Sequence, residues 1–66
     1  MKKAQLQTLS TEELHALATA FGKAFDRAYA EKDATVGLHA QDALVIIRDI
    51  LFEREIDDLN KLQGAN

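Results

Sequence analysis

Apolar residues recur at helical spacing between Thr11 and Tyr29 and lie on one side of the chain. They follow the i, i+3, i+4, i+7 pattern that predicts an amphipathic helix. At about 100° per residue they fall within one arc of roughly 140°, so this helix has a single apolar face. That face consists of Leu14, Leu17, Ala18, Phe21, Ala24, Phe25, Ala28 and Tyr29.

The residues just before this pattern carry a helix start signal. Ser10 is suited to an N-cap, because its hydroxyl can accept a hydrogen bond from an otherwise unpaired backbone N–H. Glu13, three residues later, can bond back to the Ser10 N–H and complete a capping box. Leu9 and Leu14 occupy the two positions of a hydrophobic staple. We therefore expect the first helix to begin at Thr11.

A second helix, predicted from about 34 to 62, has apolar residues on two sides. One face matches the first helix and consists of Val36, Ala40, Ala43, Leu44, Ile47, Ile50 and Leu51. A second stripe lies about 150° away on the helical wheel. Its members are Leu38, Val45, Phe52 and Leu59, spaced seven residues apart, with Ile56 beside them. A single hairpin covers only one of the two faces, so we expect the second stripe to be an interaction surface.

The connection between the two helices contains no proline, and three arrangements fit it. A tight turn at residues 32–35 is favoured, because Lys32 suits the end of one helix and Asp33 can cap the next. A turn at Gly37 is the second arrangement. An uninterrupted helix of about 50 residues is the third.

A turn at 32–35 fixes which residues face each other. In an antiparallel hairpin, facing positions would have numbers that sum to about 66. Tyr29 would then face Gly37, and Gly22 would face Leu44. Each glycine would provide space for the large side chain opposite it.

The predicted fold class is all-α, an antiparallel two-helix hairpin with helices at about 11–32 and 34–62. Residues 1–9 are expected to be a flexible segment, with Leu6 and Leu9 able to dock on the hairpin, which spans 10–62. Residues 63–66 are expected to be a frayed end. A chain of 66 residues without cysteine gains no stability from disulfides. Small domains of this kind often depend on oligomerisation, so we expect two copies to form a four-helix bundle.

The net charge of −3 comes from residues 41–66, which carry six acids and three bases. An acidic surface for a partner is predicted near the end of the second helix, at Glu53, Glu55, Asp57 and Asp58. A continuous basic patch is missing, which makes nucleic-acid binding an unfavoured expectation. No apolar run approaches the roughly 18 residues of a membrane span. No apolar segment typical of a signal peptide follows the basic N-terminus, so a cytoplasmic protein is expected.

The sequence offers little for catalysis. It has no cysteine, a single serine that is used as a cap, and no glycine-rich phosphate loop. In the expected hairpin, His15 and His39 lie on the order of 18 Å apart and cannot share a metal ion within one chain. We therefore predict no catalytic residues, no metal and no cofactor, and a protein that is not an enzyme.

Three functions are compatible with these features. The first is a homodimeric helical-bundle regulator or adaptor that binds itself through the second stripe. The second is a subunit or inhibitor of a heterologous protein, of the antitoxin, phage-type inhibitor or co-chaperone class, which would use the same stripe and the acidic end. The third is a nucleic-acid-binding dimer in which Lys23, Arg27 and Lys32 of both copies form a basic face.

Overall fold

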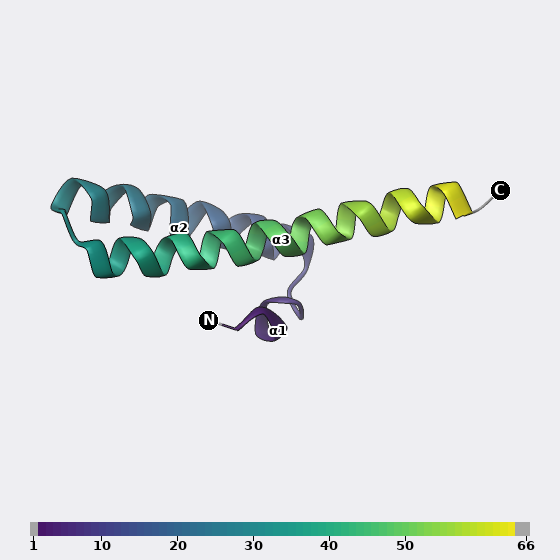
Figure 1. Cartoon of the computed structure of the whole chain (residues 1–66), viewed down its shortest axis with the longest axis horizontal. Helices are drawn as coiled ribbons and strands as arrows, with labels where there is room; N and C mark the ends of the chain where they lie inside the picture. Colours follow the sequence, from purple (N-terminus) through teal and green to yellow (C-terminus); the bar gives the residue numbers. More distant parts are fainter. Residues whose placement is uncertain (1, 65–66) are drawn as a thin grey trace.

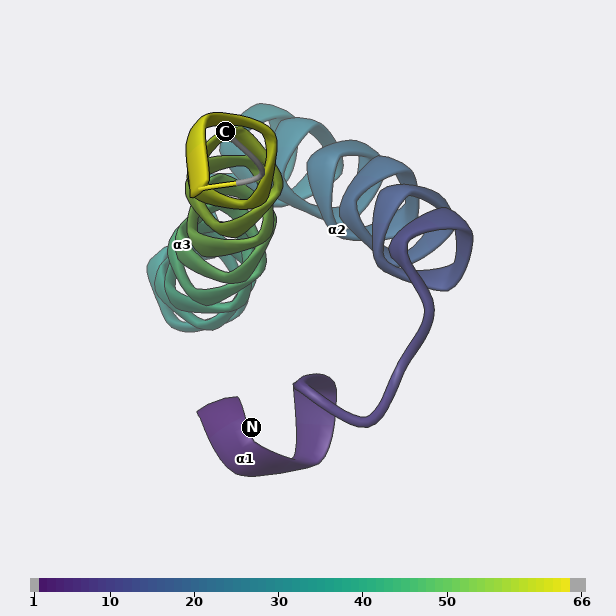
Figure 2. The ribbon, with the colours of Figure 1, turned by 90° about the vertical axis from the view of Figure 1, so that its right-hand side faces the viewer.

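Two long antiparallel helices dominate the computed structural model, which describes residues 2–64 (Figure 1). In this part of the chain a short helix α1 (Lys3–Leu6) precedes α2 (Thr11–Glu31) and α3 (Ala34–Gly64). Seen from the C-terminal end of α3, the three helices lie at the corners of a triangle (Figure 2). The predicted all-α class and the two-helix hairpin are confirmed.

The first long helix begins where the capping signal places it. The Ser10 N–H donates to Oε1 of Glu13 at 2.9 Å, and the Glu13 N–H donates to Oγ of Ser10 at 3.1 Å. The backbone N–H and then the hydroxyl of Ser10 stabilise the Glu13 carboxylate and lower its pKa below the usual value. Leu14 is fully buried and Leu9 is half-buried, as the staple positions require.

A left-handed residue ends α2. Lys32 has φ 58° and ψ 36°, and the next N–H, that of Asp33, donates to the carbonyl of Ala28 at 2.8 Å. This 6→1 bond satisfies a carbonyl group that the end of a helix otherwise leaves unpaired. Glycine usually occupies such a position, because a side chain is strained at positive φ.

Only Lys32 and Asp33 separate α2 from α3. Asp33 caps α3, since its Oδ1 accepts a hydrogen bond from the Val36 N–H at 3.2 Å. Gly37 lies within the first turn of α3, and its N–H donates to the Asp33 carbonyl at 3.0 Å. The favoured turn at 32–35 is thus confirmed, whereas the turn at Gly37 and the single uninterrupted helix are wrong.

The register is close to the expected one, but its predicted side-chain contacts are wrong. A Cβ on Gly37 would lie 3.7 Å from the Cβ of Ala28, and these two residue numbers sum to 65. Ala28 therefore takes the place predicted for Tyr29, which is 81% exposed. Nothing lies within 4 Å of a Cβ on Gly22, so Leu44 does not fill that position.

The core is narrow at the turn and wider at the open end of the hairpin. Near the turn the buried residues are alanines, Ala28, Ala40 and Ala43, whose small side chains let two helices approach closely. Toward the open end the core consists of Leu6, Leu14, Ile47 and Ile50, with Leu9, Leu17, Ala18, Phe21, Ile46 and Leu51 packed against it. Val36, predicted in this face, is 45% exposed, because it lies in the first turn of α3 beside the connection.

The N-terminal segment contributes to this core. Its sequence pattern does not predict a helix, yet α1 forms and Leu6 is only 3% exposed. Leu6 therefore docks on the hairpin, as its apolar side chain allows, within the segment expected to be flexible. Residue 1 of the expected flexible segment lies outside the described residues. At the other end, residues 63 and 64 of the expected frayed end belong to α3, and 65–66 lie outside the described residues.

Candidate protein-interaction surface

All five residues of the second stripe are exposed on α3. Leu38, Val45, Phe52, Ile56 and Leu59 each keep between 40% and 60% of their surface accessible. Their seven-residue spacing keeps them on one side of a continuous helix, because seven residues fall only about 20° short of two full turns. The second stripe is therefore a line of exposed apolar side chains along one side of α3.

Neither of the other helices covers this stripe. The face of α3 that carries Ile47 packs on α2. The neighbouring flank, which carries Ile46 and Glu53, lies against α1. There Nζ of Lys3 is 2.6 Å from Oε1 of Glu53, and Ile46 is partly buried against the core that includes Leu6. The third side of α3 is left open, and this is the side of the second stripe.

The C-terminal part of α3 extends well past the start of α2 (Figure 1). Arg54 marks the level at which α2 begins, since its Nη1 donates to Oγ1 of Thr11 at 3.0 Å. Residues 55–64 then continue for roughly 15 Å as a single helix. We call this segment the overhang. It carries Ile56, Leu59 and also Leu62, which is 72% exposed.

Leu62 is an exposed apolar residue that the stripe analysis missed. It lies about 60° from Leu59 on the helical wheel. If α2 were long enough to reach this level, the Leu62 side chain would face the hairpin core. The seven-residue spacing of the stripe therefore does not identify Leu62 as exposed. Its exposure follows from the different lengths of the two helices, 21 residues for α2 and 31 for α3.

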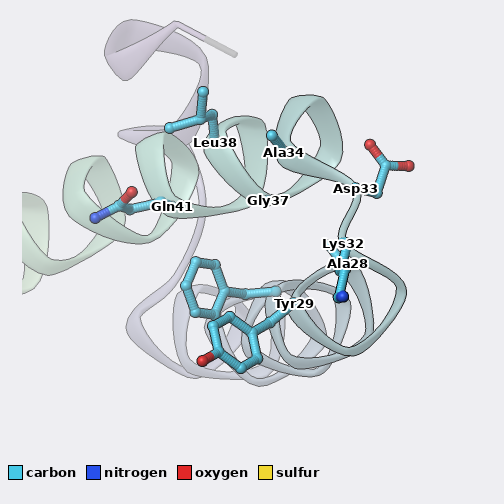
Figure 3. A pocket seen from close by; sticks show the side chains of 9 residues that line it. Ala28, Tyr29, Lys32, Asp33, Ala34, Gly37, Leu38 and Gln41 are labelled. Atoms are coloured by element: carbon cyan, nitrogen blue, oxygen red, sulfur yellow. The ribbon is translucent and has the colours of Figure 1, made fainter.

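A groove of about 400 Å³ runs between the ends of α2 and α3 beside the turn (Figure 3). Tyr29 and Phe25 line it from α2, whereas Leu38 and Gln41 line it from α3. Gly37, which has no side chain, also lines it. Sequence reasoning missed this groove because it placed Tyr29 in the core.

A second groove, of about 450 Å³, continues along the same two helices. It is lined by Ala18, Gln41, Leu44, Val45, Ile47, Arg48 and Leu51. Gln41 borders both grooves, and both reach the second stripe, the first at Leu38 and the second at Val45. The candidate surface is thus the second stripe together with the apolar seam beside it.

The predicted acidic residues do not form one patch. Glu53, Glu55 and Asp57 are exposed, but successive members of this series point about 200° apart on the helix. The charge of Glu53 is also balanced within the chain by Lys3. Its carboxylate is the main cause that raises the pKa of Lys3 above the usual value. Glu55 lies on the flank that borders the seam, and Asp58 lies farther round that side.

The other candidate groups are spread over the surface. Nε of Arg27 pairs with Oε1 of Glu31 at 3.2 Å, which balances part of the basic face that a nucleic-acid-binding dimer would use. Between residues 2 and 64, no three His, Cys, Asp or Glu side chains are grouped so that they could hold a metal ion. In the same range, no helix is both long enough and apolar enough to cross a bilayer.

Comparisons with protein-family models, with curated proteins and with solved structures found no significant match to this chain.

Proposed function

We propose that this chain is a small protein-interaction module that works as a homodimer, with the second stripe of one copy packed against that of the other. One observation carries the proposal: five large apolar side chains, each 40% to 60% exposed, form a continuous line on one helix. Exposed apolar surface of this extent typically marks an interaction site. With two helices from each copy, the dimer would be a four-helix bundle, suited to a regulator or adaptor.

The size of the apolar surface indicates moderate affinity. Full burial of one such side chain contributes roughly 1.5–3 kcal/mol, and about half of each is still exposed. Ten side chains from two copies would then contribute on the order of 10 kcal/mol. Association costs an estimated 4–15 kcal/mol, which leaves at most about 6 kcal/mol, so the dissociation constant is expected at tens of micromolar or above.

Sedimentation equilibrium across about 1–500 µM protein tests the proposal in that range. We expect the mean mass to rise from that of one chain to that of two. Phe52→Glu should keep the chain monomeric with unchanged helix content by circular dichroism, because Phe52 is 60% exposed and contributes little to the hairpin core.

Val36→Glu is the matched control. Val36 is also an exposed apolar residue of α3, at 45% exposure, but it lies about 120° or more from the members of the second stripe. Its substitution should leave association unchanged. A wild-type chain that is folded and monomeric at every concentration would refute self-association.

A heterologous partner is the second candidate, and the exposed acids Glu55 and Asp58, which lie on the side of α3 beside the seam, favour it. Such a partner would cover the same stripe and carry basic groups that these acids attract. This function predicts binding that weakens with salt and with the triple substitution Glu55→Gln, Asp57→Asn, Asp58→Asn. A purified partner that binds the triple variant with full affinity would remove the acidic residues from the interface.

A further inference from the structure

We infer that the two copies pair their α3 helices in antiparallel orientation about Phe52, so that the overhang of each copy lies along the hairpin of the other. This inference rests on the proposed self-association and assigns its geometry. In this geometry a second copy of this chain covers the second stripe.

The spacing of the stripe supports a two-fold axis at Phe52. Val45 and Leu59 lie seven residues on either side of it. In an antiparallel pair centred there, Phe52 meets the partner's Phe52, and Val45 meets the partner's Leu59. The overhang, which has no neighbouring helix from α2, then gains one from the partner subunit.

Charge complementarity on one flank of the stripe supports the same arrangement. Arg48 and Glu55 lie on one flank of the stripe, about 20° apart on the helix. Their numbers sum to 103, and residues facing each other across an axis at Phe52 sum to 104. Arg48 of each copy would therefore lie beside the partner's Glu55, which gives two equivalent ion pairs. Among the described residues, neither side chain belongs to an ion pair within its own chain.

For Arg48 and for the C-terminal part of α3, the parallel arrangement is less favourable in charge. In a parallel pair, a residue on one flank of the stripe faces a residue of the partner helix. That partner residue is about five positions later in the sequence and lies on the opposite flank. For Arg48 this residue is the partner's Glu53. The Glu53 carboxylate is already paired within its own chain, because its Oε1 lies 2.6 Å from Nζ of Lys3. A parallel pair also brings two copies of residues 53–64 side by side, and each copy carries four acids and two bases. Like charges placed in this way repel.

Charge reversal at the two flanking residues tests the orientation. Arg48→Glu alone places two acids together at each contact, and Glu55→Arg alone places two bases together. Each single variant should raise the dissociation constant of its homodimer roughly tenfold. When the two variants are mixed, both contacts of the mixed dimer are again between opposite charges. Native mass spectrometry of the mixture should then show the mixed dimer in clear excess over the statistical half.

Arg27→Glu mixed with Glu31→Arg is the matched control. These substitutions change the net charges by the same amounts, but they lie on α2 at an exposed pair away from the second stripe. Their mixture should give the statistical share of mixed dimer. A statistical share from the Arg48 and Glu55 variants, in a protein whose wild type does dimerise, would overturn the antiparallel geometry. A wild type that never dimerises would refute the proposed function instead.

A distance measurement provides a second test. The chain has no cysteine, so Asn60→Cys, at an exposed position, places one spin label on each copy. In the antiparallel dimer the two labelled positions are 16 residues apart along the helices, which is roughly 24 Å of axial separation. In a parallel dimer they lie level, at roughly 10 Å between helix axes. A pulsed electron paramagnetic resonance distribution centred on the shorter separation would overturn the inference.

Discussion

Arg54 of α3 lies 2.7 Å from the carbonyl oxygen of Leu9, measured from its Nη2 atom. The same Nη2 donates to the Gln7 carbonyl at 3.2 Å, and Nη1 donates to the Thr11 hydroxyl at 3.0 Å. One side chain thus joins α3 to the connection between α1 and α2. Backbone carbonyls outside a helix need such donors, and a guanidinium group can supply several at once.

Arg54→Met should loosen the N-terminal segment and destabilise the hairpin. Methionine keeps much of the aliphatic length but leaves the carbonyls of Gln7 and Leu9 without their donor. We expect a loss of about 1–3 kcal/mol in the free energy of unfolding, measured by urea denaturation. Arg27→Met, which removes an exposed pair within one helix, should cost less than about 0.5 kcal/mol. Equal effects from the two substitutions would contradict the role given to Arg54.

Leu6→Ala tests whether α1 is part of the core. Leu6 is 3% exposed and belongs to the same cluster as Leu14 and Ile50. Removing a buried leucine side chain typically costs about 2–5 kcal/mol, and a terminal site that can relax should lie near the lower value. Leu62→Ala, at 72% exposure, should have little effect in a dilute, monomeric sample. An unchanged urea midpoint for Leu6→Ala would show that α1 does not dock in solution.

Lys32→Gly should stabilise the hairpin. Among the described residues, Lys32 is the one non-glycine residue with a positive φ, at 58°. A side chain in this backbone region costs about 1–2 kcal/mol. Glycine removes that strain but gains conformational freedom in the unfolded chain. A net gain of about 0.5–1 kcal/mol is expected, measured as a higher thermal midpoint. Lys32→Ala removes the same charge but keeps a side chain at positive φ, so it should not raise the thermal midpoint.

The capping box predicts a loss of stability in acid. Because the bonds from Ser10 lower the pKa of Glu13 in the folded chain, the ionised carboxylate contributes stability above its usual pKa of 4.5. This contribution is lost as the pH falls from 4.5 through the lower folded value. Glu13→Gln should therefore show a smaller decrease in thermal midpoint than wild type over that range. Identical acid profiles would mean that the capping box does not couple to folding.

Local signals in the sequence were enough to predict the hairpin. The start of α2 depends on Ser10 and Glu13, and the start of α3 depends on Asp33. Each of these contacts joins residues three positions apart, so the sequence spacing reveals it directly. The apolar periodicity then gives the two faces of α3, including the one that α2 does not cover.

Contacts between distant residues could not be predicted in the same way. Arg54 bonds to residues more than 40 positions away, and Lys3 pairs with Glu53 across 50 positions. The exposure of Tyr29 depends on the close approach of Ala28 to Gly37, which the helical wheel does not show. For the candidate surface, the heptad predicted the stripe residues, whereas Leu62 and the grooves depend on helix length and packing.

The overhang lies outside the hairpin core, so its sequence can change with little effect on the fold. Residues 55–64 extend past the start of α2, so extra residues inserted after Glu55 would leave the hairpin core intact. Seven inserted residues would keep Leu59 almost in phase with Phe52, whereas five would rotate it by about 140°. The rotational phase of this segment can therefore change without altering the fold, and in the proposed dimer that change would alter which side chains meet the partner subunit.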